Sequence, residues 1–147
     1  MTEAAVHVDH ESAQVKGMGA VGRLNEHFIQ LNREIEMVIN RSTRLTCDGP
    51  LKIFYDQNKM IFYRNVKVTD ERGTLTAKRM DVLFDPTAKK VKQIIAIGDV
   101  MILRGTDTTR SRRAIYTLAT GSVRLEGSPH ITLHKESQKL LDAPLRN

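Results

Sequence analysis

The residues best suited to chemistry in this chain are one cysteine and a few histidines. Cys47 is the only thiol, so it forms no disulfide within the chain, and a catalytic thiol would need a histidine beside it in space. None of the histidines has metal-ligand spacing with Cys47, and on extended strands the short pairs put their members on opposite or distant positions. We therefore expect a structural, half-buried cysteine, surface histidines, no catalytic residue and no metal site. The five histidines are His7, His10, His27, His130 and His134.

A glycine-rich segment at residues 17–22, GMGAVG, is the nearest approach to a nucleotide-binding motif. Such glycines cradle phosphates only when a strand precedes them and a helix follows. Here the preceding residues, with Val6, Val8 and Val15 around the turn-forming Asp9–Ser12, indicate a hairpin instead. We expect no cofactor.

The chain carries more basic than acidic residues, 23 Lys and Arg against 17 Asp and Glu, which gives a net charge of +6. Its surface therefore favours anions such as nucleic acid, anionic lipid or phosphorylated sugar. A nucleic-acid interface would need aromatic rings among the basic residues. There are only four Phe and three Tyr, with no Trp, and most of these aromatic residues occupy the alternate strand positions that carry apolar side chains. Nucleic acid is kept as an alternative partner and is not expected.

Apolar residues recur at every second position along most of the chain, a spacing typical of β-strands. The clearest example is residues 73–103, where a strand, a turn at Asp85–Ala88 and a return strand follow one another. Residues 24–39 fit both a helical stripe and a strand face interrupted at Arg33, and their β-branched residues favour the strand. The apolar positions of the example are Met80, Val82, Phe84, Val91, Ile95, Ile97, Val100 and Ile102.

Four hairpins repeat one spacing, an apolar residue before the turn and another seven positions later. Each hairpin has one apolar face that it cannot bury alone, so stacked hairpins would enclose an apolar interior. We predict an all-β, antiparallel domain over residues 1–134, with a loosely ordered tail at 135–147. The spaced pairs are Val8 and Val15, Tyr55 and Phe62, Phe84 and Val91, and Tyr116 and Val123.

Four short motifs follow one another in the sequence: RGTLTA, FD-turn-KKV, AIGDVMI and AIYTLATGSVRLEGSP. Because of these motifs, residues Val6 to Leu133 resemble the OstA-like domain of the periplasmic lipopolysaccharide-transport proteins, the LptC/LptA family. The resemblance implies a twisted β-jellyroll that is open along one side. It also implies a periplasmic, non-enzymatic carrier whose apolar interior holds the acyl chains of lipopolysaccharide. LptC has an N-terminal transmembrane helix that docks on the transporter. Neither that helix nor a signal peptide is recognisable here, so we expect either an anchor or leader that has been removed, or an LptA-like member.

The resemblance assigns roles to two sets of residues. The edge strands would pair with other Lpt-type β-jellyrolls or with a second copy, through Val6, Val8, Ile131 and Leu133; an LptC-like member would also meet the inner-membrane transporter. Basic residues near the opening, Lys78, Arg79, Arg110 or Arg112, are candidates for contact with lipid phosphates. A nucleic-acid-binding β-domain and a self-assembling structural protein remain the alternatives. The interior residues expected to touch lipid are Ile35, Met37, Ile53, Tyr55, Met60, Phe62, Val82, Phe84, Ile95, Ile97, Val100, Ile102, Tyr116, Val123 and Leu125.

Overall fold

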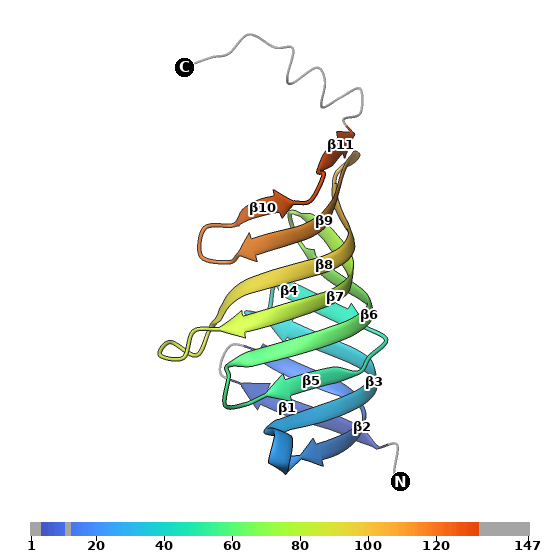
Figure 1. Cartoon of the computed structure of the whole chain (residues 1–147). Helices are drawn as coiled ribbons and strands as arrows, with labels where there is room; N and C mark the ends of the chain where they lie inside the picture. The colour runs from blue at the N-terminus through green and yellow to red at the C-terminus, as the bar shows by residue number, and fades with distance from the viewer. Residues whose placement is uncertain (1–3, 11–12, 133–147) are drawn as a thin grey trace.

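The computed structural model describes residues 4–10 and 13–132, and this part of the chain forms one antiparallel sheet of eleven strands with a single 3-10 turn (Figure 1). No helix in these residues is long and apolar enough to cross a membrane. The elements are β1 (Ala5–His10), β2 (Ala13–Arg23), η1 (Leu24–Glu26), β3 (Phe28–Ile39), β4 (Thr43–Cys47), β5 (Leu51–Phe54), β6 (Lys59–Asp70), β7 (Gly73–Phe84), β8 (Val91–Arg104), β9 (Asp107–Thr117), β10 (Ser122–Glu126) and β11 (His130–Thr132).

The strands are stacked almost in the order of the sequence, β1-β2-β3-β4-β6-β7-β8-β9-β10. The short strands β4 and β5 share one place in the stack, because β4 pairs with one half of β3 and β5 with the other half. At the far end β10 and β11 likewise divide β9 between them. The stack therefore begins at β1 and finishes at β10 and β11, and these two ends lie at opposite extremes of the molecule (Figure 1).

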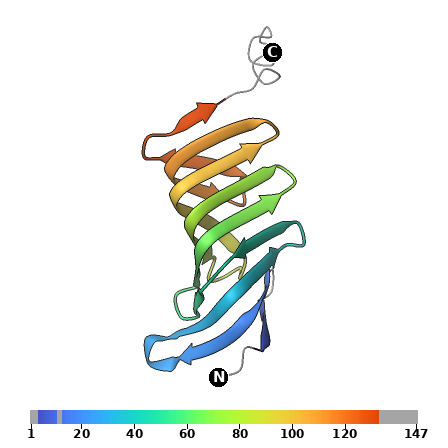
Figure 2. The same ribbon diagram turned by 90° about the vertical axis from the view of Figure 1, so that its right-hand side faces the viewer.

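A row of β-bulges crosses the long strands at one level. The extra residues are at Glu34 in β3, Arg64–Asn65 in β6 and Gly98–Asp99 in β8, and all of them have positive φ. A bulge bends its strand and increases the local twist. With one in every second or third strand, the whole sheet bends along this line, on the right-hand side in Figure 1 and facing the viewer in Figure 2.

The bend brings the two ends of each strand into opposite layers. Strands β7 and β8 lie between β6 and β9 in the sheet, yet the Tyr116 hydroxyl of β9 lies 3.4 Å from Oδ2 of Asp70 in β6. Such a contact is possible only if the sheet folds over on itself. We call residues 66–76 and 100–111 the first half-sheet, and residues 59–63, 79–97 and 113–126 the second half-sheet.

The apolar residues that alternate along the strands fill the space between the layers. Leu31, Met37, Phe62, Met80 and Ile94 are all completely buried, and they belong to one cluster with most of the other interior residues. Removing their apolar surface from water is the main favourable contribution to folding, and close packing makes it specific. The antiparallel, all-β architecture predicted from the sequence is confirmed, including the strand at Phe28–Ile39.

Three of the four predicted hairpin pairs face each other across a turn. Val8 opposes Val15, Phe84 opposes Val91 and Tyr116 opposes Val123. The turn at Asp85 is also as predicted, since its carboxylate accepts hydrogen bonds from the backbone N–H groups of Thr87 and Ala88. In these three hairpins, a regular spacing of seven residues was enough to place both strands.

Tyr55, the fourth case, does not face the interior. Strand β5 ends at Phe54, and the carbonyl of Phe54 accepts a hydrogen bond from Gln57 N–H, so the turn begins one residue earlier than predicted. Tyr55 is 48% exposed and its ring lies edge-on to His27, with 6.3 Å between the ring centroids. The prediction that Tyr55 belongs to the interior is wrong because Tyr55 lies in the turn and does not continue the in-and-out alternation of strand β5.

The interior phase predicted for part of β8 is also wrong. Ile95 and Ile97 are half-buried and lie on the outer face, where Ile95 is in register with Asp81, while Ile94 and Ala96 are completely buried inside. A register shift just after Val91, where the pairing of β8 with β7 slips by one residue, exchanges the two faces. A slip of one position sends every following side chain to the other face.

The expected last strand is present but exposed. Ile131 lies in β11 and its side chain is 58% exposed, so it is not an interior residue. Leu133 and the predicted tail at 135–147 lie outside the described residues.

A substitution at Gly49 tests the close backbone packing next to the bulges at which the sheet bends. Gly49 sits between β4 and β5 with a φ of 102°, and a Cβ there would come within 2.5 Å of the Asn32 carbonyl oxygen. We expect Gly49→Ala to lower the free energy of unfolding by at least about 2 kcal/mol, because the substitution adds both a clash and an unfavourable φ. Gly22→Ala is the matched control, since nothing lies within 4 Å of its added Cβ. Urea denaturation of both variants measures the difference, and equal stabilities would contradict this account of the bend.

Candidate functional site

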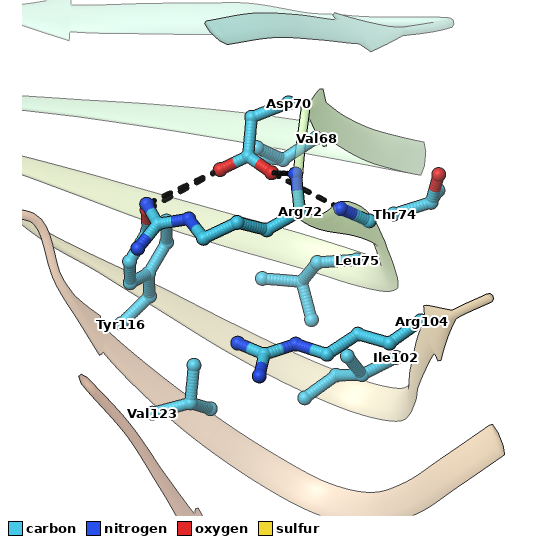
Figure 3. Close-up of a pocket in the computed structure, with 10 residues that line it drawn as sticks. Val68, Asp70, Arg72, Thr74, Leu75, Ile102, Arg104, Tyr116 and Val123 are labelled. Carbon is cyan, nitrogen blue, oxygen red and sulfur yellow. Dashed lines mark hydrogen bonds and ion pairs between the residues drawn. The ribbon is translucent and has the colours of Figure 1, made fainter. Parts of the chain in front are cut away.

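A pocket opens between the two half-sheets, on the side away from the bend (Figure 3). Its apolar lining combines Val68, Leu75 and Ile102 from the first half-sheet with Tyr116 and Val123 from the second. The space that a water-sized molecule can reach is about 40 Å³. Because one water needs roughly 10–15 Å³ by the same measure, the pocket holds only a few waters. It marks where the layers meet, and a larger guest requires the layers to separate.

Three polar side chains join the layers at the rim of this pocket. Asp70 is the last residue of β6, Arg72 lies in the turn between β6 and β7, and Tyr116 belongs to β9 in the other layer. The Arg72 guanidinium donates a hydrogen bond to the Tyr116 hydroxyl, and that hydroxyl lies 3.4 Å from Asp70 Oδ2. Arg72 also lies 3.4 Å from the same carboxylate oxygen, and its guanidinium stands 5.3 Å from the centroid of the Tyr116 ring. We call Asp70, Arg72 and Tyr116 the rim cluster.

The turn itself fixes the rim cluster. Asp70 Oδ1 accepts hydrogen bonds from the backbone N–H groups of Arg72 (2.8 Å) and Gly73 (3.2 Å), which holds the carboxylate over the turn and leaves Oδ2 for the other layer. Aspartate forms this kind of turn readily because its short side chain reaches the backbone two residues ahead. Gly121, after β9, has a φ of 69°, and a Cβ at this position would collide with the Arg72 guanidinium. The absence of a side chain at residue 121 therefore makes room for Arg72.

Burial raises the pKa of the Tyr116 hydroxyl, although the neighbouring Arg72 acts in the opposite direction. The hydroxyl thus stays protonated at neutral pH, and it accepts a hydrogen bond from Arg72 while its own proton can be donated to Asp70. The side chain of Asp70 is only 12% exposed, so this contact lies partly out of water. The rim cluster is a closed set of polar contacts at the border of an apolar interior.

A second arginine, Arg104, lies at the end of β8 and lines the same pocket. Its side chain passes over Gly73, where an added Cβ would come within 3.1 Å of Arg104 Cγ. Figure 3 shows the guanidinium groups of Arg72 and Arg104 directed to the same side of the pocket. A shallower hollow continues from here past Ile102 and Val123 to Leu125.

Apart from Tyr55, Ile95 and Ile97, which do not face the interior, the predicted lipid-facing residues fall into two groups in the structure. Ile102, Tyr116 and Val123 line the pocket, and Leu125 lines its extension. The others that face inward are packed in the core away from this opening. They are Ile35, Met37, Ile53, Met60, Phe62, Val82, Phe84 and Val100.

The four basic residues predicted for the opening lie elsewhere in the structure. Lys78 is at the bend, 3.1 Å from Asp99, and Arg79 forms two hydrogen bonds with Asp81 on the outer face. Arg110 is exposed, and Arg112 packs over Gly127. None of these four lines the pocket. Arg72 and Arg104 were missed because they occupy turn ends, and only the folding of the sheet brings turn ends from different hairpins together.

Cys47 is a structural residue. Its side chain is buried in the core cluster, and burial raises the pKa of the thiol to about 11. A nucleophilic cysteine needs the opposite shift. Among residues 4–10 and 13–132, no group of three or more His, Cys, Asp or Glu side chains is arranged to hold a metal ion.

Comparison with known protein families matches residues 51–141, more than half of the chain, to the family described as LptA/(LptD N-terminal domain) LPS transport protein. The chain belongs to this family. Membership makes it a lipopolysaccharide-transport protein, as the sequence phrases indicated, and the folded-over sheet is the β-jellyroll of the family.

A solved structure agrees with this assignment of the fold. The crystal structure of LptH from Pseudomonas aeruginosa, the LptA-homologous periplasmic component of the lipopolysaccharide transport device, matches 83% of this chain and 94% of LptH with a TM-score of 0.66. The sequence identity is 8%, so the likeness concerns the fold alone. No curated protein matches the sequence.

The buried thiol gives a pH-dependent test of the packing around Cys47. The pKa of the thiol is about 11 in the folded protein, against 9.0 for a cysteine that is not buried, so the folded state holds the proton more tightly. The stabilisation is complete below pH 9 and is lost as the pH rises to 11, with a fall of about 2 kcal/mol in the free energy of unfolding. Urea denaturation of reduced protein at pH 8 and pH 11 measures this fall. Cys47→Ala removes this contribution, and an equal pH dependence in the variant would contradict it.

Proposed function

We propose that this protein is a periplasmic carrier of lipopolysaccharide that holds acyl chains between the two half-sheets and pairs edge to edge with other β-jellyrolls. The observation that carries the proposal is the pocket between the layers, whose apolar lining is continuous with the core and whose rim is closed by side chains alone. The family supplies the substrate class, and the geometry supports a route by which it enters.

Lipid binding in this proposal requires the layers to move apart. The pocket itself has only about 40 Å³ free, while the hollow beside it, past Ile102 and Val123 to Leu125, has about 340 Å³. A chain that passes from this hollow to the core would enter by separating Val68, Leu75 and Ile102 from Tyr116 and Val123. Each methylene removed from water contributes about 0.8 kcal/mol, so a chain of many methylenes readily offsets the loss of a few contacts at the rim. The contacts that join the layers here are weak and polar, which suits repeated opening.

In the part of the chain that the structure describes, the residues lining the pocket include no pair arranged to perform chemistry on the lipid. The polar groups of the pocket are an aspartate, two arginines, a threonine and a tyrosine, and their contacts at the rim are those of a structural closure. A carrier needs moderate affinity and easy release. We therefore assign the protein a transport role without catalysis.

Strand β1 offers the clearest edge for a partner. Gly19 N–H donates to the Ala4 carbonyl, which makes Ala5 and Met18 a pair without mutual hydrogen bonds. By the alternation of an antiparallel ladder, Val6 and Val8 direct their backbone groups to β2, and His7 directs its N–H and C=O outward. An exposed edge of this kind is completed by adding a strand.

The nucleic-acid alternative receives no support from the outer face. Aromatic rings are present there beside basic residues, with Lys52 Nζ 5.2 Å from the Phe28 ring centroid and Arg79 5.7 Å from that of Tyr63. Phe28 is buried, and the lysine and arginine chains cover the rings. Stacking platforms for bases must present open ring faces.

A photo-crosslinker on β10 tests whether lipid enters between the layers. Val123 lines the pocket, whereas its neighbour Arg124 points outward with 72% of its side chain exposed. We expect p-benzoylphenylalanine at position 123 to capture lipopolysaccharide and the same group at position 124 to capture little. Gel shift after irradiation gives the yields. Stronger capture from position 124 would rule out the interior as the carrier site.

A proline at the edge of β1 tests strand addition. His7→Pro removes an outward N–H while leaving the bonds between β1 and β2 in place, so we expect association between copies to weaken about tenfold with the fold intact. His7→Thr keeps the N–H and is the matched control. Sedimentation over a range of concentrations measures association, and a wild-type chain that stays monomeric would contradict pairing between copies through β1.

A further inference from the structure

The pocket carries two positive charges that the apolar interior does not require. Arg72 and Arg104 come from different hairpins, and their guanidinium groups lie on one side of the pocket (Figure 3). Among the described residues that line the pocket, Asp70 is the one carboxylate, and Asp107 is paired with Arg104 in the ladder between β8 and β9. The three charged lining groups, Asp70, Arg72 and Arg104, give a net charge of +1 in the same pocket as Val68, Ile102 and Val123. An apolar floor under a positive rim matches an amphiphile with an anionic head.

The two arginines differ in how they are held. Arg72 is engaged with Asp70 and Tyr116, whereas Arg104 has no hydrogen bond or ion pair from its side chain within the described residues. The Cγ of Arg104 lies over Gly73, and the residue is exposed where it lines the pocket. An accessible guanidinium is well suited to bind phosphate, because its planar donors match two phosphate oxygens.

We propose that Arg72 and Arg104 bind a phosphate group of the lipid at the rim of the pocket, and that this phosphate displaces Asp70 from Arg72 and so opens the rim cluster. The inference rests on the proposed function and adds a named site for the head of the lipid. Asp70 shares only one oxygen with Arg72, at 3.4 Å, because the other oxygen is engaged by the backbone of the turn. A phosphate offers several oxygens and more charge than this contact, so it competes well for the guanidinium.

Displacement of Asp70 also affects the contact between the layers. The Tyr116 hydroxyl is joined to the first half-sheet through Arg72 and Asp70. When Arg72 turns to phosphate, the Arg72–Tyr116 hydrogen bond is lost and only the contact between Tyr116 and Asp70 still joins β9 to the end of β6. The same event that binds the lipid head therefore weakens the closure that its chains have to pass.

The experiment compares two lipids that differ only in phosphate. Bisphosphorylated lipid A and the same lipid A with both phosphates removed are titrated against the full chain with the crosslinker at position 123, and the concentration for half-maximal capture is measured. We expect the phosphorylated lipid to be captured at about tenfold lower concentration, the effect of one to two charged hydrogen bonds partly exposed to water. Arg104→Gln should reduce this ratio to less than about threefold.

Two further variants complete the design. Arg110→Gln removes the same charge from an exposed position outside the pocket and should keep the tenfold ratio. Arg72→Lys keeps the charge but loses the planar donors, and it should reduce the ratio while the protein stays folded, as circular dichroism verifies. Equal capture of both lipids by the wild type, or equal effects of Arg104→Gln and Arg110→Gln, would overturn the phosphate site and leave the carrier proposal standing. Capture of neither lipid would overturn both.

Discussion

The structure depends on one constraint: a sheet with a single apolar face has to cover that face with itself. The bulges at Glu34, Arg64–Asn65 and Gly98–Asp99 meet this constraint, because they let each long strand turn a corner and lie in two layers. The local pairing supports the bend, with Glu34 N–H donating to the Asp48 carbonyl and Asp48 N–H to that of Arg64. No helix or second sheet is needed to complete the core of the described residues.

This way of closing leaves the two long sides of the molecule unlike each other. On the bend side the layers are joined by continuous backbone, so they cannot separate there. On the opposite side they are joined by side chains such as Arg72 and Tyr116. In the proposed carrier, opening would therefore be confined to this side, where side-chain contacts and not continuous backbone join the layers.

Local sequence predicts the hairpins well and the layers poorly. Val8 with Val15, and Phe84 with Val91, are paired as expected, because a strand, a turn and a return are encoded within a dozen residues. The faces of β8 were misjudged because one slipped position after Val91 exchanges them, and no residue type there announces the slip. The rim cluster was out of reach because Asp70 and Tyr116 are 46 residues apart and meet only after the sheet bends.

The two ends of the stack have different shapes, and this gives an assembly a direction. At one end, β1 covers only the half of β2 that runs from Ala13 to Met18. At the other end, β10 and β11 together cover both halves of β9. If one end of the stack pairs with the other end of the next domain, the contact is heterologous, and such contacts propagate in a line where no rotation closes a ring. A row of these domains would therefore have polarity, and cargo moving along it would meet every unit in the same orientation.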